Sequence, residues 1–220
     1  MTDVNFERAR YNMVEQQVRP WEVLSERVLD LIDRLPREDF VPVRYRNVAY
    51  GDLQIPIGHG EVMMEPRVEA RLLQALDPVP GESALEIGTG TGYVTACLSQ
   101  LAGTVTSVER LDDLRDGAAE RLAAHDIRNV RLESGDAAQG WDDGRRYDVI
   151  AVTGSLPELH EGFHRSLTVG GRLFVIVGGP PIMEALLITR MADEQWAVES
   201  LFDTSIRPLV GAPRTVRFQL

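Results

Sequence analysis

The chain has 220 residues, which suits one α/β domain with a modest extension and a core that folds without disulfides. Its net charge is −11 and its 23 basic residues are all arginine, so chemistry on a catalytic lysine is excluded and no nucleic-acid partner is expected. The single cysteine (Cys97), the lack of a signal peptide and the lack of an apolar run near the roughly 20 residues of a membrane span predict a cytoplasmic protein without a membrane partner.

Residues 1–78 are expected to form N-terminal helices and a loop that pack on the core. Hydrophobic periodicity predicts helices over 5–18 and 23–34. Residues 40–65 are predicted to be mostly loop, because prolines and glycines punctuate them. Pro66 favours the start of a helix that continues to about Leu76.

Residues 79–220 show alternating strand and helix patterns. The predicted strands span 84–87, 104–108, 130–132, 147–152, 172–177, 184–191, 196–202 and 215–218, and the predicted helices 93–101, 112–124 and 157–167. This alternation predicts an α/β fold with a doubly wound, mostly parallel sheet. We expect a Rossmann-like core, with residues 1–78 as a helical extension and one structural unit overall.

A glycine-rich turn follows the first predicted strand of this core. The segment reads Glu86-Ile87-Gly88-Thr89-Gly90-Thr91-Gly92. Glycines let the chain turn sharply and let a ligand approach the backbone. The spacing differs from the dinucleotide fingerprint and from a P-loop. An acidic residue just before Gly-x-Gly-x-Gly, here separated from it by Ile87, is typical of enzymes that bind S-adenosylmethionine (SAM).

Two further predicted strands end in acidic residues. Glu109 follows the second strand, at about the 20-residue offset from Glu86 expected of a ribose-binding carboxylate, and Asp136-Ala137 follows the third strand, where adenine is expected. Taken singly, Glu109 and Asp136 are better explained as solvated loop carboxylates than as functional residues. Together with the glycine turn, at three successive strand ends, they indicate a SAM site. The predicted cofactor-binding residues are Glu86, Gly88, Thr89, Gly90, Gly92, Glu109, Asp136 and Ala137.

No metal site is expected. The chain has four histidines, and His160 and His164 lie four apart on a predicted helix without an apparent third ligand.

Motifs upstream and downstream of the glycine turn point to one family. They are Met13-Val14-Glu15-Gln16-Gln17, Leu35-Pro36-Arg37-Glu38-Asp39-Phe40-Val41-Pro42, Ala49-Tyr50-Gly51-Asp52, Ile55-Pro56-Ile57-Gly58, Ser107-Val108-Glu109-Arg110 and Val152-Thr153. With the glycine turn, they resemble the protein-L-isoaspartate O-methyltransferase family over roughly residues 10–180. Arg207-Pro208-Leu209 looks like the family's C-terminal Val-Pro-Leu segment.

The resemblance implies a SAM-dependent O-methyltransferase that acts in protein repair and releases S-adenosylhomocysteine. The implied acceptor is the side-branch carboxylate of an isoaspartyl residue in an aged protein or peptide. The methyl ester then collapses to a succinimide, and hydrolysis returns some normal aspartate. A carboxylate is already ionised at pH 7, so alignment of the reacting atoms should dominate catalysis.

The chain departs from the family on the acceptor side. The family carries a Thr-Ile-Ser segment before a proline, and its serine is thought to orient the substrate. Here Val62 replaces the threonine and Met64 the serine. Methionine cannot donate a hydrogen bond to a carboxylate. Glu61 and Glu65 add negative charge that repels an anionic acceptor if both face the site.

Three interpretations follow, with His59, Glu61 and Met64 as the candidate catalytic residues. In the first, backbone amides or His59 orient the isoaspartyl carboxylate. In the second, the protein methylates a different acceptor in an apolar pocket, with Glu61 as general base. In the third, it binds SAM without catalysis, as a regulatory module. The oligomeric state is not decided by the sequence.

Overall fold

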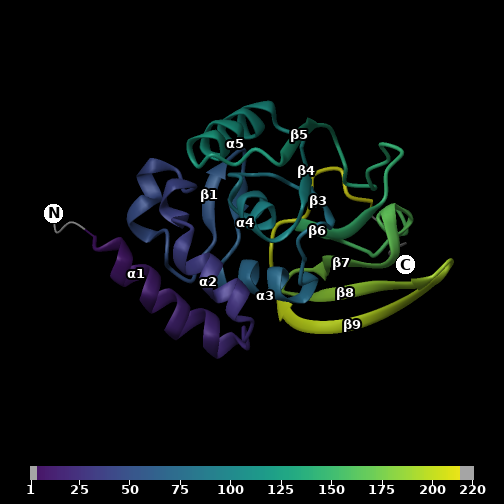
Figure 1. Ribbon diagram of the computed structural model, residues 1–220, viewed down its shortest axis with the longest axis horizontal. Helices are drawn as coiled ribbons and strands as arrows, with labels where there is room; N and C mark the ends of the chain where they lie inside the picture. Colours follow the sequence, from purple (N-terminus) through teal and green to yellow (C-terminus); the bar gives the residue numbers. More distant parts are fainter. Residues whose placement is uncertain (1–3, 214–220) are drawn as a thin grey trace, which may run out of the picture.

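The computed structural model describes residues 4–213, so the expected strand at 215–218 lies outside the described residues. The N-terminal part is helical, as predicted (Figure 1). Helix α1 (Phe6–Met13) is capped by Asn5, whose side chain accepts from the Arg8 amide. It continues as a π-helix (Val14–Val18) and a 3₁₀ turn (Arg19–Trp21), and α2 (Glu26–Arg34) follows.

The segment before α3 (Pro66–Leu76) contains structure that the loop prediction missed. Two 3₁₀ segments (Arg37–Asp39 and Val43–Val48) precede an antiparallel hairpin of β1 (Ile55–Gly58) and β2 (Glu61–Met63). Strands of four and three residues are too short to give a clear alternating pattern. The hairpin turn uses positive φ at three successive residues, Gly58, His59 and Gly60.

The remaining chain forms a seven-stranded sheet in the order β5-β4-β3-β6-β7-β8-β9. The strands are β3 (Ser83–Ile87), β4 (Thr104–Glu109), β5 (Val130–Ser134), β6 (Tyr147–Leu156), β7 (Leu167–Gly179), β8 (Ile182–Ala192) and β9 (Gln195–Thr204). The first five strands in this order pair in parallel, whereas β8 is antiparallel to both of its neighbours. This topology confirms the predicted α/β class with a mostly parallel sheet.

Two hydrophobic clusters cover the two faces of the sheet. On one face, α2, α3 and α4 (Tyr93–Leu101) pack on residues such as Ala84 and Phe174. On the other face, Leu85 and Val175 pack against a segment that carries Phe163. Helix α5 (Asp112–Ala124) contacts β4 and β5 at the edge of the sheet. Helices α3, α4 and α5 begin and end at the residues predicted for them, 66–76, 93–101 and 112–124.

The helix predicted over 157–167 is wrong. That segment contains turns and a short 3₁₀ helix (His164–Ser166), and β7 already begins at Leu167. Gly162 packs so closely on the backbone of Gln139 that a Cβ there would lie 1.9 Å from its carbonyl oxygen. Tertiary packing thus overrides local helix propensity. His160 and His164 do not share a helical face.

After β9 the chain returns to the carboxyl end of β6 (Figure 1). Ser155 on β6 donates its amide to the Arg207 carbonyl and accepts from the Leu209 amide, both at 2.9 Å. These bonds place residues 206–210 beside the ends of the central strands.

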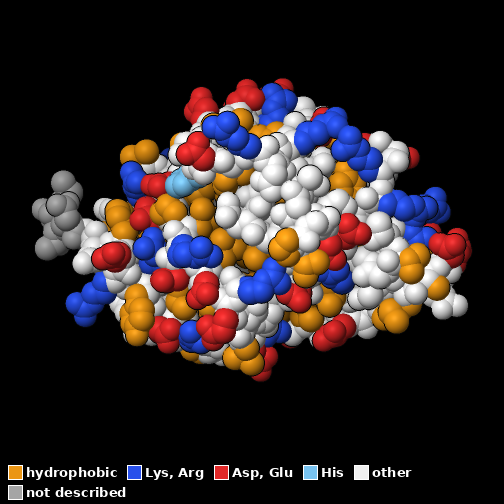
Figure 2. Space-filling view, in the orientation of Figure 1, with side chains coloured by type: hydrophobic (Ala, Val, Ile, Leu, Met, Phe, Trp, Pro, Cys, Tyr) orange, Lys and Arg blue, Asp and Glu red, His pale blue; other side chains and the backbone are white. Residues whose placement is uncertain are grey.

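The visible surface carries acidic and basic side chains interspersed with one another (Figure 2). Within residues 4–213, no helix has the length and apolar character needed to cross a membrane.

Candidate active site

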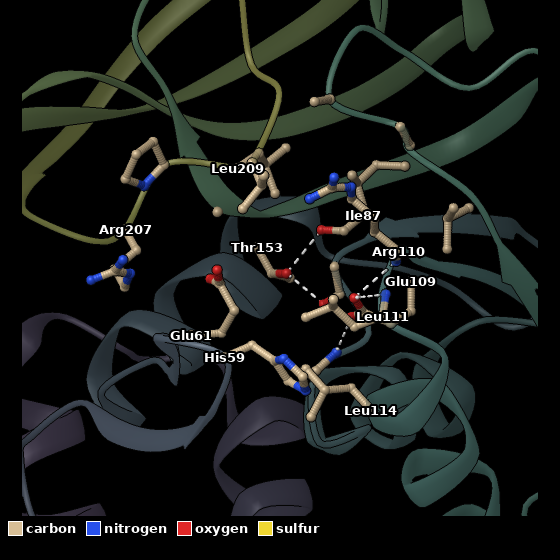
Figure 3. A pocket seen from close by; sticks show the side chains of 18 of the residues that line it. His59, Glu61, Ile87, Glu109, Arg110, Leu111, Leu114, Thr153, Arg207 and Leu209 are labelled. Atoms are coloured by element: carbon tan, nitrogen blue, oxygen red, sulfur yellow. Dashed lines mark hydrogen bonds between the residues drawn. The ribbon is translucent and has the colours of Figure 1, made fainter.

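A cavity of about 400 Å³ lies at the carboxyl ends of the parallel strands. Its wall combines the β1–β2 hairpin, the ends of β3, β4 and β6, the loop after β5 and residues 206–210 (Figure 3). Most of the predicted site residues line it: His59, Glu61, Met64, Gly88, Gly90, Glu109, Asp136 and Ala137. Glu86 and Thr89 instead line a smaller adjoining cavity of about 40 Å³, together with Met63, Met64 and Gly88.

Neighbouring side chains lie so close to the glycine turn that a Cβ would collide with them at Gly88 and would be crowded at Gly92. Gly88 has φ +96°, and a Cβ there would lie 2.6 Å from the Thr153 hydroxyl oxygen. That hydroxyl lies 2.8 Å from the Ile87 carbonyl oxygen and 2.7 Å from that of Gly88, where it donates. Gly92 lines neither cavity: it caps α4 with φ +87°, and its Cβ position is 3.1 Å from Ala118 on α5. Gly92 thus serves helix packing.

Glu109 sits at the end of β4 and joins the glycine turn to the next loop. One carboxylate oxygen accepts from the Gly90 amide at 2.8 Å. The other accepts from the amides of Arg110 at 2.8 Å and Leu111 at 3.0 Å. The carboxylate is fixed by three backbone donors while still lining the cavity, and an ionised carboxylate has further lone pairs for ligand hydroxyls.

Glu86 is completely buried beneath the turn. Its Oε2 accepts from the hydroxyls of Thr95 at 2.5 Å and Ser107 at 2.6 Å, and the Thr89 hydroxyl lies 2.5 Å from that of Ser107. Its Oε1 has no hydrogen-bond partner among the described residues. Burial raises the pKa of Glu86 to about 8, although the two hydroxyls lower it. A buried acceptor without a partner suits a cationic ligand group.

Asp136 and Ala137 follow β5 at the other end of the cavity. Asp136 Oδ1 accepts from the Ala138 amide at 3.1 Å, and its Oδ2 lies 3.7 Å from the Arg110 guanidinium. Gly211 approaches the same carboxylate, since a Cβ there would lie 2.9 Å from Oδ2. Ala137 is buried in the wall.

His59 bridges the hairpin to α5. Its Nε2 lies 2.7 Å from Asp113 Oδ2, in the first turn of that helix. The hydrogen bond with His59 lowers the pKa of Asp113. In this structure, one ring nitrogen of His59 is therefore already engaged.

The segment that replaces the family's Thr-Ile-Ser lines the cavity with apolar side chains, and Glu61 beside it adds one carboxylate. Val62 and Met64 line the main cavity, whereas Met63 turns to the smaller one, where its sulfur accepts from the Thr91 hydroxyl at 3.7 Å. Glu61 faces the main cavity (Figure 3). Glu65 does not line either cavity and accepts instead from the Gln54 amide at 3.3 Å. Only one of the two glutamates thus adds negative charge to the wall.

Three contributors were missed as site residues by sequence reasoning. Thr153 and residues 207–209 lie in segments quoted for the family resemblance, and residues 206 and 210 flank the second of these, but nothing in the local pattern shows that they line the cavity. Arg37 is fully buried and donates to the Met64 carbonyl at 2.6 Å, to Glu69 and to the Ala49 carbonyl. A buried arginine 27 positions from its partner leaves no local signal in the sequence.

The sheet topology, the glycine turn and the strand-end carboxylates together define a Rossmann-like methyltransferase. The family profile described as "Protein-L-isoaspartate(D-aspartate) O-methyltransferase (PCMT)" matches residues 8–212. The chain belongs to this family, which confirms the predicted SAM-dependent O-methyltransferase class.

Relatives of the same description cover nearly the whole chain. Protein-L-isoaspartate O-methyltransferase 1 of Rhodopseudomonas palustris is 40% identical over 208 residues, which are 94% of this chain and 85% of the relative. Protein-L-isoaspartate O-methyltransferase 2 of Pelobacter propionicus is 36% identical over 94% of this chain and 93% of its own.

A solved structure supports the fold. It is a Plasmodium falciparum chain described as a protein-L-isoaspartate O-methyltransferase in complex with S-adenosyl-L-homocysteine. It superposes with a TM-score of 0.76 at 21% identity, covering 94% of this chain and 99% of that chain.

Proposed function

We propose that this protein transfers the methyl group of SAM to the free carboxylate of isoaspartyl residues in proteins and peptides. The observation that carries the proposal is a single cavity whose wall joins the cofactor-type strand ends to the hairpin and the 206–210 segment. Cofactor and acceptor then meet without a conformational rearrangement of the fold. Family membership supports the same activity.

The residues of the main cavity and of the smaller cavity beside it fit SAM. Glu109 is placed to accept from ribose hydroxyls, and Ala137 and Asp136 to contact adenine. The unpaired Glu86 Oε1 would face the ammonium of the methionine end. When bound, SAM supplies an electrophilic methyl group on a sulfonium. The chain's own residues have to hold the acceptor carboxylate in line and exclude water, which is the main part of such catalysis.

A different acceptor is the second candidate, because Val62 and Met64 present apolar surface where the family has hydroxyls. In that case Glu61 is the candidate base for a neutral nucleophile. Labelled SAM with a cell extract, resolved by size, separates a protein acceptor from a small molecule.

We also propose a cytoplasmic location, which the single, buried cysteine supports.

The test uses labelled SAM and two matched peptides, one isoaspartyl and one aspartyl, with base-labile methyl esters as the readout. We expect label in the isoaspartyl peptide only. Gly88→Ala should abolish it, because the added Cβ would lie 2.6 Å from Thr153 Oγ1. Gly179→Ala is the matched control, since nothing lies within 4 Å of that position. Absence of label, or equal label in both peptides, refutes the proposal.

A further inference from the structure

Arg207 brings a guanidinium to the cavity wall without a partner. Of the two arginines that line the wall, Arg110 lies 3.7 Å from Asp136. The Arg207 guanidinium makes no hydrogen bond or ion pair with any residue in the range 4–213. Its backbone is nevertheless fixed, because the Arg207 carbonyl accepts from the Ser155 amide at 2.9 Å. The backbone position of Arg207 is therefore fixed, while its exposed guanidinium is free to bind a ligand.

The position of this side chain is on the acceptor side. Its Nη2 lies against the hairpin turn, 3.4 Å from where a Cβ of Gly60 would be. Figure 3 shows Arg207 and Glu61 on one side of the cavity and Glu109 on the other. The guanidinium thus lies away from the carboxylate expected to hold the ribose.

Other donors for an anionic acceptor are scarce on that side. Val62 and Met64 offer no side-chain donor, and His59 already pairs with Asp113. Glu61 repels a carboxylate. An anion taken out of water needs a compensating donor or charge. Arg207 is the cation of the described wall that meets this need without breaking an existing bond.

We propose that Arg207 determines acceptor specificity by binding the isoaspartyl carboxylate, in place of the hydroxyls that Val62 and Met64 lack. The inference rests on the proposed function. One carboxylate oxygen stays with the guanidinium while the other forms the new bond to the methyl carbon. The bond from that carbon to the sulfonium sulfur breaks with its electron pair left on sulfur. No proton moves, so Glu61 is not needed as a base.

Arg207 also stands where the resembled C-terminal segment carries valine. The gain of a cation and the loss of two hydroxyls therefore occur in one cavity. This predicts that the two changes compensate each other.

Steady-state kinetics with the isoaspartyl peptide test the proposal. Arg207→Val should raise KM about tenfold with a much smaller change in kcat, as expected for loss of a charge-assisted bond. Arg207→Lys should recover part of the affinity, and Glu61→Gln should lower KM. Adding Met64→Ser to Arg207→Val should restore much of the loss. A KM for Arg207→Val within twofold of the unaltered enzyme overturns the inference.

A binding measurement distinguishes failure of this inference from failure of the proposed function. S-adenosylhomocysteine-loaded protein is titrated with the peptide and with its carboxamide analogue, and fluorescence anisotropy reports the affinity. Unchanged S-adenosylhomocysteine affinity checks that each variant is folded. Binding without methyl transfer, lost in Arg207→Val, upholds Arg207 and refutes the function. Methyl transfer that is indifferent to Arg207 upholds the function and refutes the inference. No binding and no transfer refute both.

Discussion

Glu86 shows how burial sets the chemistry of a single residue. The carboxyl group is fully buried, and burial raises its pKa to about 8; the charges of Glu109 and Glu69 raise it further, against the hydroxyls of Ser107 and Thr95. Without cofactor, Glu86 is then largely protonated at pH 7. A ligand ammonium beside Oε1 favours the ionised form, so binding has to release a proton.

This predicts that the affinity for S-adenosylhomocysteine rises between pH 6 and 7.5, at a limit of about tenfold per pH unit. Calorimetry in buffers of different ionisation enthalpy measures both the affinity and the released proton. Glu86→Gln should weaken binding and remove the pH dependence, whereas Glu120→Gln, on the exposed side of α5, should change neither. An affinity independent of pH contradicts the account.

The same pKa has a consequence for stability without cofactor. The folded pKa of Glu86 is raised above its ordinary value of 4.5, so the folded state holds its proton over a window in which the unfolded state has lost it. The free energy of unfolding should therefore fall as pH rises from about 4.5 to 8. Glu86→Gln should flatten this decline. Glu69, with a pKa raised to about 7 by burial, leaves a residual slope below that pH.

The site residues differ in how far the sequence reveals them. Gly88, Gly90, Glu109, Asp136 and Ala137 follow predicted strands, and parallel strands bring their carboxyl ends to one edge. The sequence also predicted Gly92, but the structure places it between helices. Arg207 becomes a site residue only through the return of the chain to β6, and no local pattern encodes that contact.

At the scale of elements, Arg37 joins three pieces that have no periodic signal linking them. It donates to the carbonyls of Ala49 and Met64 and forms an ion pair with Glu69 on α3 at 3.0 Å. Both charged side chains are buried, and the guanidinium also lies over the Tyr93 ring at 5.4 Å. Arg37 thus fixes the backbone of Met64, which lines the cavity.

Arg37→Met should reduce the free energy of unfolding by about 3 kcal/mol, because it leaves a buried carboxyl and two carbonyls without their donor. Chemical denaturation measures the change. Arg34→Met is the matched control: Arg34 is exposed on α2 and donates only to its own helix, so we expect a change within about 0.5 kcal/mol. A decrease in the free energy of unfolding below 1 kcal/mol for Arg37→Met would show that the contacts of Arg37 are dispensable for stability.

Element prediction succeeded where periodicity or a proline set the boundary. Pro66 opens α3, and α5 spans its predicted range. It failed at 157–167, where Gly162 packs on a distant backbone, and at the hairpin, whose strands are very short. At 157–167 a contact with a segment far away in the sequence decides the local structure, whereas the hairpin is a local pairing that is too short to give a pattern.

At the scale of the whole molecule, the alternation of strands and helices predicted the parallel part of the sheet. The strand order and the antiparallel addition of β8 and β9 follow from pairing that the pattern does not specify. The expected division of the chain near residue 78 stays a prediction. Residues on both sides of that position share one hydrophobic cluster.

The central claim is that one cavity holds cofactor and isoaspartyl carboxylate together, with the acceptor on the Arg207 side. A crystal structure with S-adenosylhomocysteine and an isoaspartyl peptide tests it most directly. The account predicts adenosine between Glu109 and Ala137, and the acceptor carboxylate at the Arg207 guanidinium, with one oxygen facing the sulfur across the space of a methyl group. A peptide carboxylate bound elsewhere, or a cofactor outside this cavity, would contradict it.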